Sequence, residues 1–299
     1  MTPSARRPSV GFIGLGAMGR PMAANVAAAG YDLTVWRRDA STPLALEAPG
    51  VTEAASPGEL AAACSVVVLC VSDGPDVLNV LFGPGGLAEG LAPQSLVIDC
   101  STTAPAVAED AAARLSTRGV GFVDAPVTGG TEGAQRGTLT MLVGGADADV
   151  RAAEPVLATM GSRIVHLGPV GAGQRAKAVN QVILAGTYLA VAEGVVLALR
   201  TGLEPAAVVD ALGTGAAGSW VLANRAQRMI DDDYPLGFRL ALHRKDLRIA
   251  LELAARAGAS LPVAALAAAL EDGLIAQGYG DDDNAALARA IRALSGLSR

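Results

Sequence analysis

Three glycines near the start of the chain have the spacing of a loop that binds phosphate. Gly14, Gly16 and Gly19 form a Gly-x-Gly-x-x-Gly pattern that follows an apolar run and precedes an alanine-rich segment. In a strand–loop–helix context the first glycine makes a tight turn, the second lets the backbone approach a pyrophosphate, and the third allows close helix–strand packing. The N–H groups at the start of the helix then hold the anion. The pattern predicts a dinucleotide site over Gly14, Leu15, Gly16, Ala17 and Met18, with a plain tight turn as the alternative.

Two adjacent arginines indicate which dinucleotide is preferred. A site for NAD usually carries an acidic residue about 20 residues after the glycines, where it bonds the ribose hydroxyls. Here the second apolar run ends in Trp36-Arg37-Arg38. Two guanidinium groups can grip a 2′-phosphate and leave the ribose diol without its usual carboxylate acceptor. We therefore predict NADP(H) over NAD(H), unless the arginines are merely solvated and Asp39 takes the acidic role.

Two further segments carry groups suited to a small acid. The stretch 124–130, Asp-Ala-Pro-Val-Thr-Gly-Gly, ends an apolar run with a hydroxyl and exposed N–H groups, a nest suited to a carboxylate, although Gly-Gly after a strand is more often a turn. Lys177 and Asn180 are three residues apart, so both project from one helix face. When hydride reduces an aldehyde, a lysine ammonium can polarise the carbonyl and protonate the alkoxide. Taken alone, Lys177 would more simply be a surface lysine.

These residues need a sheet to position them, and the first half of the chain has the pattern of one. Short Val/Ile/Leu-rich runs alternate with alanine-rich helical segments such as residues 20–29, which is the rhythm of βαβ units in a parallel sheet. Apolar runs without alternation indicate strands covered on both faces. The predicted strands span residues 10–13, 32–36, 65–71, 96–99, 121–125, 138–143 and 163–167.

After residue 173 the pattern becomes helical throughout. Residues 176–199 contain no proline and predict one long helix, and further helices are expected over 204–212, 219–230, 240–257, 262–277 and 284–294. A cluster of Gly and Pro at residues 168–173 marks the boundary, and 299 residues suit two domains. We predict an α/β chain with a Rossmann dinucleotide-binding domain over 1–170 and an all-helical domain over 171–299, joined by the long interdomain helix.

Composition excludes several classes of protein. A net charge of −6 without a basic block disfavours nucleic-acid binding, and 51% apolar residues exclude disorder. The mean hydropathy of +0.39 comes mostly from alanine, so we expect no membrane insertion. Cys64, Cys70 and Cys100 include no Cys-x-x-Cys pair, which indicates buried free thiols and a cytoplasmic location.

Together with three more stretches, these motifs resemble the β-hydroxyacid dehydrogenase family over residues 10–290. The further stretches are 99–103, Asp-Cys-Ser-Thr-Thr; 235–238, Pro-Leu-Gly-Phe; and 245–247, Lys-Asp-Leu. The family includes 3-hydroxyisobutyrate dehydrogenase and tartronate semialdehyde reductase, also called 2-hydroxy-3-oxopropionate reductase. The resemblance implies an NAD(P)-dependent oxidoreductase that interconverts a small 3-hydroxy acid and its semialdehyde, with the substrate between the domains.

The resemblance also implies roles for single residues. Lys177 becomes the general acid and base, Asn180 orients the substrate, and the acid group lies on Thr128, Gly129 and Gly130. On the cofactor side it places Thr102 near the nicotinamide, Val71 and Ser72 near the adenosine ribose, and Lys245 at the cofactor. The chain departs from the family pattern at Thr128, Gln181 and Ser72, where Ser, a second Asn and Pro are usual. Trp220, Asn224 and Phe238 are expected to wall the substrate pocket.

Several alternatives remain beside this interpretation. Imine reductases resemble this architecture but typically lack the lysine. Succinic semialdehyde or glyoxylate reductases usually differ in the motif after Val127. A non-catalytic nucleotide-binding scaffold would usually have lost Lys177. His243 is expected on a helix surface or cleft wall rather than as a general base, and His166 has no companion ligand for a metal. The alanine-rich helices offer more apolar faces than one domain can bury, which predicts a homodimer or homotetramer.

Overall fold

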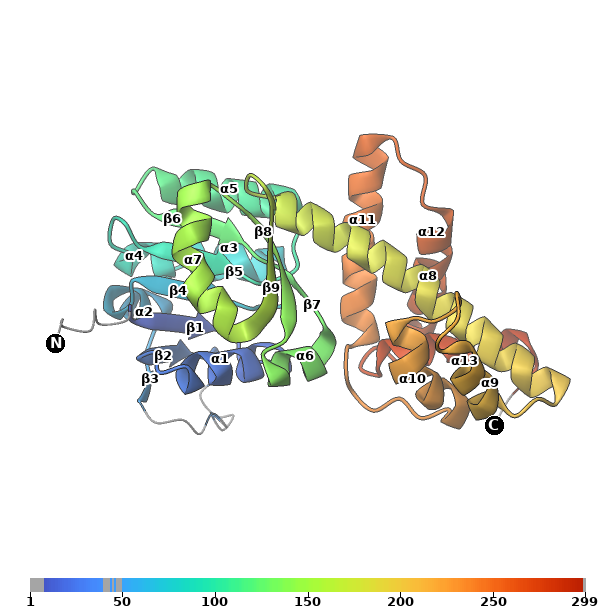
Figure 1. Ribbon diagram of the computed structural model, residues 1–299. Helices are drawn as coiled ribbons and strands as arrows, with labels where there is room; N and C mark the ends of the chain where they lie inside the picture. Colours follow the sequence, from blue (N-terminus) through green and yellow to red (C-terminus); the bar gives the residue numbers. More distant parts are fainter. Residues whose placement is uncertain (1–7, 40–43, 45, 47–49, 298–299) are drawn as a thin grey trace. The chain divides into compact units, whose positions relative to one another are not determined.

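The structure, a computed structural model, describes residues 8–39, 44, 46 and 50–297 (Figure 1). The chain divides into two compact units, residues 1–177 and 178–299. The division falls inside one continuous helix, α8 (Ala172–Thr201), a few residues beyond the expected boundary. An α/β fold with a Rossmann domain and a helical C-terminal domain is confirmed.

In the part of the chain that the structure describes, the first unit is built on a nine-stranded sheet of order β3-β2-β1-β4-β5-β6-β8-β7, with β9 paired to β8. Its strands are β1 (Val10–Ile13), β2 (Leu33–Trp36), β3 (Val51–Glu53), β4 (Val66–Leu69), β5 (Leu96–Asp99), β6 (Gly121–Asp124), β7 (Val127–Thr128), β8 (Leu139–Gly145) and β9 (Gly161–Gly168). Its helices before α8 are α1 (Gly19–Ala28), α2 (Pro57–Ala63), α3 (Gly74–Phe82), α4 (Leu87–Gly90), α5 (Pro105–Ser116), α6 (Gly130–Arg136) and α7 (Asp147–Met160).

The central strands are apolar because both faces of the sheet are covered. Successive side chains of a strand point to opposite faces. In β4, Val66 and Val68 join the core that also holds α1 and α7, whereas Val67 and Leu69 join the core that holds α2, α3 and α5. All four residues are buried, which confirms the predicted double coverage for this strand.

The predicted parallel sheet is confirmed from β3 to β6, but the pairing beyond β6 differs from it. β8 runs antiparallel to β6 and to β7, and β9 then pairs parallel with β8. A strand that follows β6 and runs parallel to it needs a crossover of a dozen or more residues on one face of the sheet. Here the residues between β6 and β8 instead form β7 and the seven-residue α6. β9 is a largely exposed strand rather than a doubly covered one, and β3 and β7 are too short to stand out as apolar runs.

The second unit is helical, as predicted. It contains the remainder of α8 and then α9 (Pro205–Leu212), α10 (Trp220–Asp231), α11 (Leu240–Ala257), α12 (Pro262–Ala276), the 3-10 turn η1 (Asn284–Ala286) and α13 (Leu287–Leu294). By length and composition alone, α8 is apolar enough to cross a membrane. Its buried side chains, such as Tyr188, Leu189 and Ala192, nevertheless form the core of this unit, which is the place of a core helix.

His243 lies in this core, so its expected surface or cleft position is wrong. Its side chain is fully buried, and Nδ1 lies 2.6 Å from Oε1 of the equally buried Glu271. The ring also stands edge-on to Phe238, with centroids 5.9 Å apart. α11 turns this residue toward α12, where a buried carboxylate satisfies one ring nitrogen.

Candidate active site

The carboxyl ends of β2, β1, β4, β5 and β6 form one row. Ile13 aligns with both Trp36 and Leu69, Leu69 with Asp99, and Asp99 with Asp124. The chain order reverses between β1 and β4, and ligands of open parallel sheets bind where this happens. The predicted cofactor residues of the first unit follow these strand ends, so the fold brings them to one edge: Gly14–Met18, Arg37, Arg38, Val71, Ser72 and Thr102.

The glycine loop has the shape of a phosphate cradle. Gly14 has a φ of +100°, and a Cβ there would overlap the carbonyl oxygen of Cys70. A Cβ at Gly19 would overlap the carbonyl oxygen of Gly14, so α1 and the loop touch through backbone. Around Gly16 a Cβ would meet nothing within 4 Å. The loop therefore leaves room for a pyrophosphate in front of α1, whose first N–H groups favour an anion.

The two arginines have different surroundings. Arg37 donates from Nε and Nη2 to the carboxylate of Glu53 on β3, at 2.6 and 3.0 Å. This contact raises the pKa of Arg37 and lowers that of Glu53. Arg38 meets Asp76 through one nitrogen at 2.5 Å, and its side chain is 66% exposed. Arg38 is therefore the more accessible cation, and the partner Glu53 was not foreseen because β3 is so short.

Gln174 holds the loop that carries Thr102. Its Nε2 donates to the carbonyl of Ser101 at 2.8 Å, and its Oε1 accepts from the N–H of Thr103 at 3.0 Å. The hydroxyl of Ser101 in turn accepts from the N–H of Val71 at 2.9 Å. The loops after β4 and β5 are thus joined, with Thr102 half-buried between two fixed neighbours.

Asp124 anchors the start of α8. Its buried carboxylate accepts from the N–H groups of Gly171 and Gln174 at 2.7 and 2.9 Å. Burial raises the pKa of Asp124, and these two hydrogen bonds oppose the rise. Asp124 begins the predicted acid-binding stretch 124–130, but only the fold shows what Asp124 and Gln174 position.

Lys177 lies beside the predicted acid-binding segment. Its Nζ donates to the carbonyl of Val127 at 2.8 Å, and the residue is only 8% exposed. The segment continues into Thr128 and then Gly129 and Gly130, which have φ of 134° and 67°. Such angles favour glycine and turn the backbone before α6 begins. Within the first unit, the structure therefore brings the lysine and the predicted carboxylate nest together.

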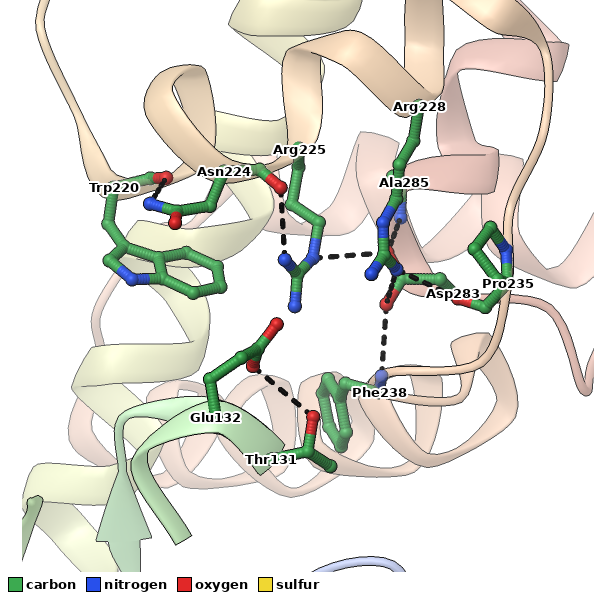
Figure 2. A network of polar contacts seen from close by, with 10 residues as sticks. All are labelled: Thr131, Glu132, Trp220, Asn224, Arg225, Arg228, Pro235, Phe238, Asp283 and Ala285. Carbon is green, nitrogen blue, oxygen red and sulfur yellow. Dashed lines mark hydrogen bonds and ion pairs between the residues drawn. The ribbon is translucent and has the colours of Figure 1, made fainter. Parts of the chain in front are cut away.

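The remaining predicted residues belong to the second unit. Asn180 lies one turn after Lys177 on α8, and Lys245 on α11 pairs with Asp246 at 3.0 Å. Of the expected pocket walls, Trp220 and Asn224 lie on α10, and Phe238 precedes α11 (Figure 2).

Two charged residues that the sequence did not single out link these walls. Arg225 is buried, lies over the Trp220 ring at 4.6 Å and donates to the carbonyl of Asn224. Asp283 is also buried, accepts from the N–H of Phe238 at 3.0 Å and lies 3.5 Å from Arg225 Nε. Figure 2 shows this network, in which Arg228 also reaches Asp283 at 3.1 Å. Burial of charged residues carries no local sequence signal.

Asp124→Asn is expected to loosen the start of α8. An asparagine offers one acceptor and sets an NH2 group against the second N–H, so we expect a loss of about 1–3 kcal/mol in unfolding free energy. Turnover should fall less than on removal of Lys177 itself. Denaturant titration measures the first effect. Asp110→Asn, in an exposed pair with Arg114, is the matched control and should change little; equal stability of both variants would contradict the anchoring role.

The comparisons with known proteins agree with this geometry. Residues 9–168 match the family described as "NAD binding domain of 6-phosphogluconate dehydrogenase", and residues 171–291 the family described as "NAD-binding of NADP-dependent 3-hydroxyisobutyrate dehydrogenase". The chain belongs to the β-hydroxyacid dehydrogenase family. It is an oxidoreductase of the hydroxyacid dehydrogenase class that uses a nicotinamide dinucleotide, as the sequence predicted.

Relatives match over nearly their whole length. An uncharacterized oxidoreductase of Synechocystis sp. is 41% identical, covering 95% of this chain and 98% of the relative. The 2-hydroxy-3-oxopropionate reductase of Escherichia coli is 35% identical over 96% of this chain and 98% of that protein. The structure of Mycobacterium tuberculosis 3-hydroxyisobutyrate dehydrogenase with L-serine is 32% identical and has a TM-score of 0.85, covering 95% of this chain and 99% of that one.

Proposed function

We propose that this family member interconverts a small 3-hydroxy acid and its semialdehyde, with Lys177 as the proton-transfer group. The observation that carries the proposal is the position of Lys177. The residue is nearly buried, and its Nζ lies 2.8 Å from the carbonyl of Val127, directly before Thr128, Gly129 and Gly130. A cation therefore stands next to a segment suited to a carboxylate.

The proposed mechanism assigns one task to each group. The Thr128 hydroxyl and the N–H groups of Gly129 and Gly130 hold the substrate's acid group. The Lys177 ammonium polarises the aldehyde oxygen and donates its proton as the alkoxide forms. A bound nicotinamide dinucleotide supplies the hydride, or accepts it in the opposite direction. In that direction the neutral amine of Lys177 takes the hydroxyl proton, and Asn180, one turn on in α8, orients the hydroxyl-bearing carbon.

A substrate panel tests the proposal against its alternatives. Oxidation of NADPH and NADH is followed with carboxylate-bearing semialdehydes, including methylmalonate and tartronate semialdehydes, and in parallel with succinic semialdehyde, glyoxylate and a cyclic imine. We expect turnover with the three-carbon-backbone semialdehydes. Preference for the imine, succinic semialdehyde or glyoxylate would replace the proposal with that alternative. Turnover with none would favour a non-catalytic nucleotide-binding scaffold.

The cofactor preference is proposed to be NADP(H), and Arg38→Ala tests it. Because Arg38 is the more exposed cation of the pair, its removal deletes charge-assisted hydrogen bonds to a 2′-phosphate. We expect kcat/KM for NADPH to fall about 10-fold or more, consistent with ~1.5–3 kcal/mol for such a bond, and kcat/KM for NADH to stay nearly constant. An equal loss with both cofactors, or a wild-type preference for NADH, would contradict the assignment.

A homodimer or homotetramer is proposed from the exposed side of α8. Val179, Ile183 and Leu197 are each about 60% exposed. A groove of about 640 Å³ with mostly apolar lining also runs along α8 between α9 and α10. Light scattering should report at least twice 29.9 kDa, and Ile183→Glu should lower that mass. A wild-type mass of one chain at all concentrations would refute the oligomer.

A further inference from the structure

A chain of hydrogen bonds links Asn180 to a buried charge in the second unit. Nδ2 of Asn180 donates to Oε1 of Gln181 at 2.7 Å, and Nε2 of Gln181 donates to Oδ2 of Asp246 at 2.7 Å. The other oxygen of Asp246 lies 3.0 Å from Nζ of Lys245. Gln181 is fully buried and Asp246 is 3% exposed, so bulk water does not compete for these bonds.

The direction of this chain is set by its charged end. A carboxylate paired with an ammonium only accepts hydrogen bonds, whereas an amide has one donor side and one acceptor side. Gln181 must therefore turn its NH2 toward Asp246, which leaves its carbonyl for Asn180. Asn180 must in turn give an N–H to Gln181. A flipped Asn180 amide would set its Oδ1 against Oε1 of Gln181, so that two carbonyl oxygens faced each other. In the observed orientation, Oδ1 and the second N–H of Asn180 remain for a ligand.

We propose that Gln181 and Asp246 are positioning residues that fix the side-chain amide of Asn180, so that its second N–H faces the substrate as a donor. This inference rests on the proposed function for the identity of the ligand. Because Lys177 takes the proton of the substrate hydroxyl, the hydroxyl oxygen is left to accept a hydrogen bond, which an amide N–H can donate. The same ligand with hydrogen in place of the hydroxyl makes no such bond. Gln181 thus acts through Asn180 and not on the substrate.

A charge exchange tests the proposal. Asp246→Asn keeps the shape, but its amide oxygen stays with the ammonium of Lys245 and its NH2 then faces Gln181. Gln181 must turn its carbonyl toward position 246, so the orientation of Asn180 is lost. In the double variant Gln181→Glu/Asp246→Asn, the new carboxylate accepts both from Asn180 and from Asn at position 246, which restores the donor role of Asn180. Gln227→Glu/Asp231→Asn is the matched control, because Gln227 donates to Asp231 at 2.9 Å on the exposed face of α10.

Kinetics at saturating cofactor give the first readout. For Asp246→Asn we expect the KM of the hydroxy acid to rise about 10-fold, with a smaller change in kcat, since one hydrogen bond is worth ~1 kcal/mol or somewhat more. The inhibition constant of the matching acid without the hydroxyl should stay nearly constant. The double variant should return KM to within about 3-fold of wild type, allowing for the altered site. The control should match wild type in all three values.

Proton exchange of the Asn180 side-chain amide gives a readout that needs no substrate. Selective ¹⁵N-asparagine labelling shows few side-chain amides, and the signal of Asn180 is assigned by its loss in Asn180→Asp. We expect exchange to accelerate about 10-fold in Asp246→Asn and to slow again in the double variant. If the wild type turned over no hydroxy acid, the proposed function would fail while this measurement still tested the relay. Unchanged exchange in Asp246→Asn, or no recovery in the folded double variant, would overturn the relay.

Discussion

Lys177→Ala is expected to lower kcat by about 10²–10⁴-fold, the range over which a positioned general acid or base contributes. The variant loses both the cation that polarises the carbonyl and the proton that neutralises the alkoxide. The Nζ of Lys177 donates to Val127, whereas the predicted pyrophosphate site lies in the glycine loop, so the dissociation constant of the cofactor should change little. Steady-state turnover and a fluorescence titration with NADPH measure the two effects separately.

Two controls separate chemistry from folding. Loss of the bond to Val127 leaves a carbonyl without its partner, at a cost of about 1–3 kcal/mol, so the melting temperature is measured alongside turnover. Lys177→Arg keeps a cation but cannot release its proton near neutral pH, and it should also be nearly inactive. Arg175 lies two residues before Lys177 and pairs with Glu109 as an exposed cation. Arg175→Ala should therefore retain activity. Turnover of Lys177→Ala within tenfold of wild type would refute the mechanism.

Substitutions at two glycines of the same loop are expected to fail in different ways. In Gly19→Ala the new methyl group overlaps the carbonyl oxygen of Gly14, so the loop or α1 must shift. We expect a loss of about 1–3 kcal/mol in unfolding free energy, as for other overpacked sites. In Gly16→Ala the methyl group meets no protein atom within 4 Å, so the melting temperature should stay close to that of the wild type.

The cofactor separates the two variants further. At Gly16 the methyl group occupies the space through which the backbone approaches a pyrophosphate. Binding of NADPH to Gly16→Ala should therefore weaken about 10-fold or more, as for a lost charge-assisted contact of roughly 1.5–3 kcal/mol. A fluorescence titration and a thermal melt on the same samples test both expectations. Wild-type affinity in Gly16→Ala would mean that the anion does not lie in this loop.

The parts of the fold that were predictable depend on neighbours in the sequence. β4 is buried on both faces, and its run of Val and Leu showed this directly. The long helix α8 was predicted from 24 residues without proline, and the helices of the second unit begin and end close to the expected positions. The antiparallel β8 was missed because strand direction depends on the path of the connecting chain, which apolar patterning does not encode.

The same division applies to the candidate site. The residue types were determined by the sequence: the glycine spacing, the arginines at 37 and 38, and a lysine and an asparagine three residues apart on one helix. Their partners were decided only by tertiary structure. Gln174 meets Ser101 across 73 positions, and Gln181 meets Asp246 across 65. Hydrogen bonds and burial depend on distance in space, so a local pattern can nominate a reactive group but not the groups that orient it.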